Sequence, residues 1–309
     1  MTKVGVYVIL RLWTLLFSPD AGPSAQFGSA WLVGGGMVTM AFGAVGMLGS
    51  QRLGHLAGFA AISSSGTLLA AVGMGHNQLT GGLLYYLLSS TVAVSALFLL
   101  TDLIERWRND GFSVAPYERK DDAPFLSADL VHSASAPLDD DEQEVIGEVI
   151  PAAAAFLGLA FITCTLVVAG LPPLSGFIGK FALIHALLNP LGLGAAGAPV
   201  AMSSWVMVGL MLVSGLFALV ALTRVGVLHF WSAHDRAAPK LLVMEGLPVA
   251  LLVLMCAALA WKAGPVLRYT EATANALHAP AGYIRAVMSA QPVPNPTAAP
   301  AGSQQETRP

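Results

Sequence analysis

The chain has 309 residues, of which 55% are hydrophobic and 11% charged, and its mean hydropathy is +0.69. This composition excludes an ordinary soluble domain and predicts an all-α integral membrane protein, a polytopic bundle of transmembrane helices. The net charge is −3, yet 12 of the 18 acidic residues lie between Glu105 and Glu148, and the sparse lysines and arginines are scattered, which excludes a nucleic-acid interface.

The first third of the sequence, residues 1–104, reads as transmembrane helices. Val4–Phe17 has only 14 residues, fewer than the roughly 20 that a helix needs to cross a bilayer, so we expect a truncated first span. Three apolar segments of membrane length follow, and they are Ala30–Leu48, His55–Met74 and Leu83–Ile104.

A polar connection then occupies residues 105–148. Its acidic run D-D-D-E-Q-E at Asp139–Glu144 is typical of a solvated, partly disordered tract. We therefore expect a loop between two membrane regions here.

Residues 149–188 carry the most informative stretch, Val167–His185, which reads V-V-A-G-L-P-P-L-S-G-F-I-G-K-F-A-L-I-H. A helix cannot hold Pro172 and Pro173 in its interior without losing backbone hydrogen bonds, yet both flanks are apolar and helix-forming. We therefore predict one membrane helix that is broken near its middle, with Gly170 and Gly176 beside the prolines. Broken helices at membrane depth are typical of transporters.

Two further spans, Ser204–Phe230 and Leu241–Trp261, complete a second membrane region at 149–262. Residues 263–290 suit one interfacial helix or two short ones, and the proline-rich tail 291–309 suits disorder.

Positive charge in the connections supports this arrangement. Lysine or arginine occurs in alternate connections, at Arg52, in 105–148 and in 232–240, and is missing from those between them. The alternation is complete only if 149–188 crosses once, and it places the acidic connection in the cytoplasm. Lys262, Arg268 and Arg285 would then violate the rule mildly on the external side.

Lys180, just beyond the break, is the strongest candidate for a functional group, because an ammonium inside a membrane is costly. The alternative is a lysine that snorkels to the headgroups. His185 is either a proton relay or a hydrogen-bonded interfacial residue, and Lys3 is either a buried charge or an exposed terminal lysine. Ser64 and Ser89 place hydroxyls at mid-span, where they either hold water or bond back to the preceding turn.

Catalytic motifs are missing from the sequence. It contains no glycine-rich phosphate loop, no paired catalytic carboxylates and no nucleophile triad, so we expect no enzyme active site. Cys164 and Cys256 lie in separate apolar segments, which excludes a disulfide framework and a cysteine metal site. We therefore expect neither a cofactor nor a bound metal.

Four segments resemble a known family. They are T-K-V-G-V-Y-V-I-L-R at Thr2–Arg11, F-A-A-I-S-S-S-G-T-L-L-A at Phe59–Ala70, L-L-Y-Y-L-L-S-S-T at Leu83–Thr91 and A-G-L-P-P-L-S-G-F-I-G-K-F at Ala169–Phe181. They look like the antiporter-like membrane subunits shared by the Mrp (Mnh, Pha) multisubunit cation/proton antiporters and respiratory complex I. The resemblance is to the D-type subunits of the Mrp antiporters in particular.

The resemblance implies a fold of two inverted repeats, of which this chain holds the second. It implies that Lys180 is the lysine of the second broken helix and that Lys3 is the lysine of the eighth helix, joined by a hydrated path. Ser64 and Ser89 stand where complex I relatives tend to have histidines, as do many Mrp-type members at the second position, so the sequence departs from the pattern and lacks a titratable relay between Lys3 and Lys180. The first repeat is missing, so we expect a fragment, a mis-set start codon or one half of a split gene.

The function implied is a subunit of a Na⁺ or K⁺/proton antiporter in a bacterial inner membrane, in a hetero-oligomer with other antiporter subunits. Two alternatives stay open. One is a proton-translocating membrane subunit of complex I or a related hydrogenase, and the other is an inert truncated product or assembly scaffold.

Overall fold

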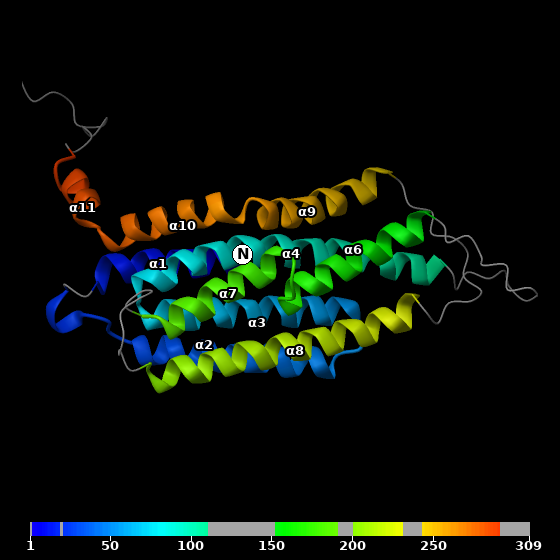
Figure 1. Cartoon of the computed structure of the whole chain (residues 1–309), viewed down its shortest axis with the longest axis horizontal. Helices are drawn as coiled ribbons and strands as arrows, with labels where there is room; N and C mark the ends of the chain where they lie inside the picture. Colours follow the sequence, from blue (N-terminus) through cyan, green and yellow to red (C-terminus); the bar gives the residue numbers. More distant parts are fainter. Residues whose placement is uncertain (1, 19–20, 111–151, 191–199, 231–242, 291–309) are drawn as a thin grey trace, which may run out of the picture.

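The structure, a computed structural model, describes residues 2–18, 21–110, 152–190, 200–230 and 243–290. Figure 1 shows that the main helices lie side by side along one axis. In chain order the helices are α1 (Thr2–Leu16), the short 3-10 helix η1 (Gly22–Ser24), α2 (Ser29–Gly49), α3 (Leu53–Met74), α4 (Asn77–Asp110), α6 (Ala152–Ala169), α7 (Ser175–Leu188), α8 (Met202–Phe230), α9 (Val243–Trp261), α10 (Ala263–His278) and α11 (Ala281–Met288).

Six of the described helices are long and apolar enough to cross a membrane. They lie in α2, α3, α4, α6, α8 and α9, and α7 is a shorter apolar helix. Figure 1 shows α6 and α7 following one another along the same direction, so together they run the length of the bundle once. The predicted all-α bundle with a broken helix is therefore confirmed.

Helix α4 is longer than the sequence pattern indicated. It begins at Asn77 rather than Leu83 and continues beyond Ile104 to Asp110. The added turns are held by contacts between helices, because Asn77 donates a hydrogen bond to Asn275 at 3.0 Å and Arg106 pairs with Glu245 at 2.8 Å. The rest of the expected acidic connection, and the expected disordered tail at 291–309, lie outside the described residues.

Helices α2 and α3 approach closely because glycines line their contact. A Cβ atom on Gly43 would lie 2.5 Å from the Ser63 backbone nitrogen and 2.8 Å from the Phe59 carbonyl oxygen. Small residues allow such contact between membrane helices, where dispersion and close packing replace the hydrophobic effect as the attractive force. The pairing of α2 with α3 thereby fixes the depth and rotation of Ser64.

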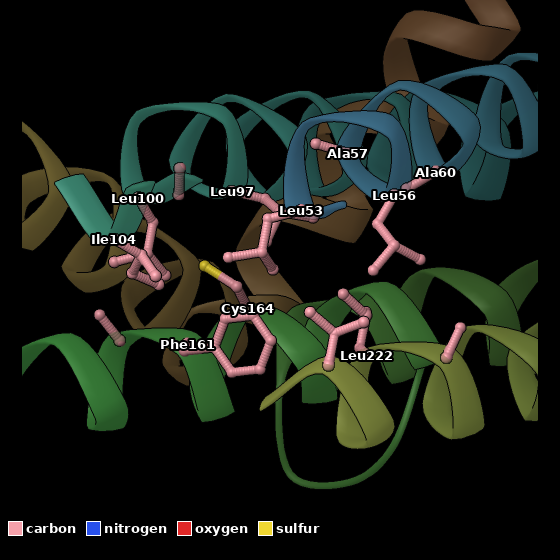
Figure 2. Close-up of a cluster of buried hydrophobic side chains, with 14 of the residues drawn as sticks. Leu53, Leu56, Ala57, Ala60, Leu97, Leu100, Ile104, Phe161, Cys164 and Leu222 are labelled. Carbon is pink, nitrogen blue, oxygen red and sulfur yellow. The ribbon is translucent and has the colours of Figure 1, made fainter. Parts of the chain in front are cut away.

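Two buried apolar clusters fill the two ends of the bundle. The first joins α3, α4, α6 and α8, and Figure 2 shows Leu53, Leu100, Phe161 and Leu222 within it. The second cluster joins α1, α3, α4, α7 and α8 through side chains that include Val6, Leu68, Leu79, Leu183 and Met207. Along α3, α4 and α8 the two clusters use different stretches of each helix. The layer between them holds polar residues beside a smaller apolar cluster of Val92, Ala93, Val167 and Cys256.

The range 263–290, expected to hold one interfacial helix or two short ones, contains α10 and α11. Figure 1 shows α10 continuing the line of α9 along the bundle. A hydrogen bond of 2.8 Å joins Thr80 on α4 to His278 Nε2, and partial burial lowers the pKa of His278 below its ordinary value of 6.5. The neutral imidazole therefore suits this docked position of α10.

Leu222→Ala tests the packing between these helices. Leu222 is fully buried whereas Leu216, on the same helix, is 56% exposed. We expect Leu222→Ala to lower the free energy of unfolding by about 2 kcal/mol or more, because the cavity it leaves cannot close fully. The matched variant Leu216→Ala should change it by less than about 0.5 kcal/mol. Reversible unfolding in mixed micelles would measure both, and equal effects would contradict the packing described.

Candidate functional site

The break between α6 and α7 is built by local sequence. Gly170 adopts a left-handed conformation with φ of 81°, and the Leu171 amide donates to the Leu166 carbonyl at 2.9 Å, which closes the end of α6. Such a closure favours glycine because a side chain is strained at positive φ. Pro172 and Pro173 follow and have no amide hydrogen with which to continue the helix.

The first turn of α7 packs directly on the last turn of α6. A Cβ atom on Gly176 would collide with the Val167 carbonyl oxygen, so only glycine fits this crossing. Ser175, at the start of α7, accepts a hydrogen bond of 2.9 Å from Ser89 on α4, and both serines are fully buried. The two halves of the broken helix are therefore held against each other and against α4.

Lys180 reaches back from α7 to the end of α6. Its Nζ donates to the carbonyl oxygens of Val168 at 3.1 Å and Ala169 at 2.8 Å. These carbonyls have no partner further along the helix, and the end of a helix carries partial negative charge, so an ammonium is stabilised there. The Lys180 amine therefore does not extend toward the headgroups, because it donates hydrogen bonds to backbone carbonyls inside the bundle.

Two glycines leave room for the Lys180 side chain. A Cβ atom on Gly170 would lie 2.5 Å from Lys180 Cδ. On α8, a Cβ atom on Gly215 would lie 2.7 Å from the Ala169 carbonyl oxygen and 3.4 Å from Lys180 Nζ. Helix α8 therefore forms one wall of the lysine site.

Lys3 is the second buried amine. It lies on the buried face of α1 with 9% of its surface exposed, and its Nζ donates a hydrogen bond of 2.6 Å to Ser64 on α3. Ser64 in turn donates to the Ala61 carbonyl at 3.0 Å. The hydroxyl thus accepts from the amine while it bonds back to its own helix.

A cavity of about 30 Å³ connects the surroundings of the two amines, since both Ser64 and Lys180 line it. That volume is sufficient for one or two water molecules. The other polar residues in its lining are Ser63, Thr67, Tyr86, Ser89, Ser90 and Ser214. Its lining includes Met47, Ala60 and Ala218 of the first apolar cluster and Tyr86 of the second, so the cavity lies where the two clusters meet.

His185 lies elsewhere. It lines a second pocket of about 530 Å³ together with residues of α4 and α10, on a different face of α7 from Lys180. The structure therefore brings Lys180, Ser64 and Ser89 to one cavity and places Lys3 beside it, but it does not bring His185 there.

Several cavity residues were not singled out by the sequence pattern. Tyr86, Thr67 and Ser214 lie within apolar helices and line the cavity because their helices are rotated toward it, and Gly215 lies beside Lys180 without lining the cavity. In the sequence, the two adjacent small residues Ser214 and Gly215, within a helix of mostly large apolar residues, are the signal that could have indicated a close approach of α8.

A search of family models found no match to this chain. Curated proteins do match. A probable K(+)/H(+) antiporter D-type subunit of Rhizobium meliloti (strain 1021) is 45% identical over 94% of this chain and 51% of its own length. The Na(+)/H(+) antiporter D-type subunit of Bacillus subtilis (strain 168) is 26% identical over 93% of this chain and 50% of its own length. The chain thus spans about half the length of these relatives.

Solved structures show the same fold. The Mrp complex from Dietzia sp. DQ12-45-1b matches with a TM-score of 0.59 and 18% identity, over 88% of this chain and 25% of that chain. Respiratory complex I from Thermus thermophilus matches with a TM-score of 0.60 and 19% identity, over 89% of this chain and 49% of that chain.

Gly215→Ala tests the wall of the lysine site. We expect it to lower the free energy of unfolding by about 1–3 kcal/mol, because the new methyl group presses on backbone and on Lys180. Gly209→Ala on the same helix is the control, since a Cβ atom there has no neighbour within 4 Å. That control should be neutral or stabilising by up to about 1 kcal/mol, because alanine favours helix. Unfolding in mixed micelles reports both, and a neutral Gly215→Ala would refute the close approach.

Proposed function

We propose that this chain belongs with the D-type antiporter subunits, to one of which it is 45% identical, and that it serves in a multisubunit antiporter that exchanges Na⁺ or K⁺ for protons. It is a transporter subunit rather than a catalytic enzyme, and its partners are the other subunits of the complex. Its own contribution is a segment of the proton path, with Lys180 and Lys3 as the groups that gain and lose a proton.

One observation carries this proposal: one amine lines a cavity with several hydroxyl groups, and a second amine donates to a serine of its wall, with apolar clusters on both sides. Lys3 contacts the cavity residue Ser64, and Lys180 lines the cavity itself. A hydroxyl donates one hydrogen bond and accepts others, so serines and one or two waters can pass a proton in either direction. The apolar clusters oppose charge movement along the bundle axis, so the proton moves sideways between helices.

The break in the helix makes Lys180 a group with two stable forms. As an ammonium it donates to the carbonyls of Val168 and Ala169. As a neutral amine it accepts a proton from the cavity, because its lone pair is then free. Gly170 and Gly215 have no side chains to displace the Lys180 side chain from these contacts.

Orientation follows from the distribution of positive charge. Arg52, Arg106 and Arg224 lie at one end of the bundle, where Arg224 donates hydrogen bonds to the carbonyls of Leu48 and Ser50. We assign this end to the cytoplasm, because short cytoplasmic connections are enriched in lysine and arginine. The acidic connection that follows α4 then lies in the cytoplasm as well.

The complex I alternative rests on fold alone, since the match to that structure is 19% identical. The relative that is 45% identical favours the antiporter. The serines at positions 64 and 89, in place of titratable relays, agree with that preference.

Lys180→Ala tests the proposal, in the complete antiporter complex. We expect cation-dependent proton exchange in everted vesicles to be lost, because no group remains at the α6 end to carry the proton. Lys262→Ala is the matched control, since Lys262 is an exposed lysine outside the cavity, and it should leave exchange unchanged. Assembly of the complex is checked in parallel by copurification. Undiminished exchange in an assembled Lys180→Ala complex would remove Lys180 from the mechanism.

Ser64→Ala tests the connection to Lys3. Removing the hydroxyl leaves the Lys3 amine without its hydrogen-bond acceptor, and we expect the exchange rate to fall about 10- to 100-fold. The neighbouring Ser65, which donates to the Ala61 carbonyl and does not line the cavity, provides the control Ser65→Ala. Stopped-flow measurement of pH inside vesicles would separate the two. Equal rates in both variants would show that the path avoids Ser64.

A further inference from the structure

The second pocket, of about 530 Å³, is formed where α4 begins, α7 ends and α10 passes both. Its volume lies within the range of about 300–1,000 Å³ that small-molecule sites occupy. It is distinct from the lysine cavity, and the two have no lining residue in common. The residues lining it are Asn77, Gln78, Gly82, Ile178, Phe181, Ala182, His185, Ala186, Leu267, Glu271, Ala274 and Asn275.

Helices α7 and α10 present the same order of polarity to this pocket. Toward the end of the bundle, α4 contributes Asn77 and Gln78, and α7 contributes His185. Further inward α7 contributes Ile178 and Phe181. Helix α10 repeats the order, with Leu267 on the side of α9 and with Glu271 and Asn275 beyond it. The pocket therefore has a polar mouth and an apolar interior along the bundle axis.

Glycines set its shape. A Cβ atom on Gly81 would lie 2.9 Å from Glu271 Cγ, and one on Gly82 would lie 3.2 Å from Ala182. Helices α10 and α7 thus pack against α4 at two adjacent residues that have no side chain. The pocket opens as a wedge between these two contacts.

The mouth of the pocket is lined by one charged side chain and by side chains that form hydrogen bonds. Glu271 is exposed and has no ion pair with any residue in the described part of the chain. His185 packs against Phe181 with ring centroids 6.3 Å apart, and Asn77 donates to Asn275 at 3.0 Å. The mouth thus offers one carboxylate beside an imidazole and amide groups.

We propose that this pocket binds a phospholipid with a primary-amine headgroup, of the phosphatidylethanolamine class. The ammonium of the headgroup donates to the Glu271 carboxylate, a charge-assisted hydrogen bond. The phosphate accepts from amide and imidazole N–H groups at the mouth, and an acyl chain lies along Ile178, Phe181 and Leu267. Phe181 is 57% exposed, so within the described part of the chain the apolar part of the pocket is open to the side, and lipid would enter there.

The polarity order distinguishes this occupant from others. A hydrated ion makes no favourable contact with the apolar interior. An apolar helix of another protein would cover the Glu271 carboxylate without supplying a hydrogen-bond partner for it. An anionic lipid would bring its phosphate toward a carboxylate without supplying an ammonium. The inference does not depend on the proposed transport function, because neither Lys180 nor Lys3 lines this pocket.

Native mass spectrometry of the full chain, purified in mild detergent with any subunits that copurify, tests the proposal. After delipidation, equal amounts of phosphatidylethanolamine, phosphatidylcholine and phosphatidylglycerol are added and retained lipid is measured. We expect wild type to retain phosphatidylethanolamine in preference to the other two lipids. Glu271→Gln should reduce the preference over phosphatidylcholine about tenfold, because the charged hydrogen bond is lost. The control Asp102→Asn removes an exposed carboxylate far along α4 and should keep the preference.

Leu267→Trp provides a second variant that leaves every polar group in place. The larger side chain fills the apolar interior, so retention of all three lipids should fall together. Four outcomes would overturn the proposal: no lipid retained by wild type, phosphatidylglycerol retained best, an unchanged preference in Glu271→Gln, or full retention in Leu267→Trp. In addition, a photoreactive residue at position 181 that crosslinks to protein rather than to lipid in native membranes would assign the pocket to a partner chain.

Discussion

An ammonium inside a membrane protein needs oxygen atoms that no helix is already using, and this requirement organises the structure around Lys180. An intact helix offers none at mid-length, because each of its carbonyls accepts a bond from the amide four residues on. The break after Ala169 frees the carbonyls of Val168 and Ala169, and Lys180 donates to both. Gly170 closes the end of α6 and the prolines prevent its continuation, so the same few residues create the lysine site and hold it open.

The site also depends on what surrounds it. A carbonyl end and an amine would attract bulk water if the bundle were loosely packed, and the apolar clusters toward each end oppose this. Glycine contacts between α2 and α3, and the approach of α8 at Gly215, bring the helices close enough for a cavity of only about 30 Å³. In this layered arrangement the polar groups therefore follow one another across the bundle rather than along its axis.

The parts of the candidate site whose signal is local could be predicted from the sequence alone. Prolines and a lysine within an apolar segment have few explanations, so the break and Lys180 were recognisable without any knowledge of packing. The rotation of each helix about its axis has no such local signal. The sequence leaves His185 open as a relay for Lys180, but the structure places it on the other pocket, whereas Tyr86 and Ser214 line the lysine cavity from helices distant in sequence. The ends of α4 were missed for a related reason, because residues of α9 and α10 stabilise them.

The serines at the centre of the cavity constrain how the proposed path works. A histidine between two lysines could hold a proton at rest, whereas a hydroxyl passes a proton on without keeping it. Any charge that stays in this layer therefore stays on Lys3 or Lys180. Two ammonium groups served by one small cavity repel each other in a medium of low dielectric constant, so the states with a single charge are favoured. Loss of the proton from one lysine then favours its arrival at the other, and this exchange of a single charge is the coupling that the two buried amines and their serines can provide.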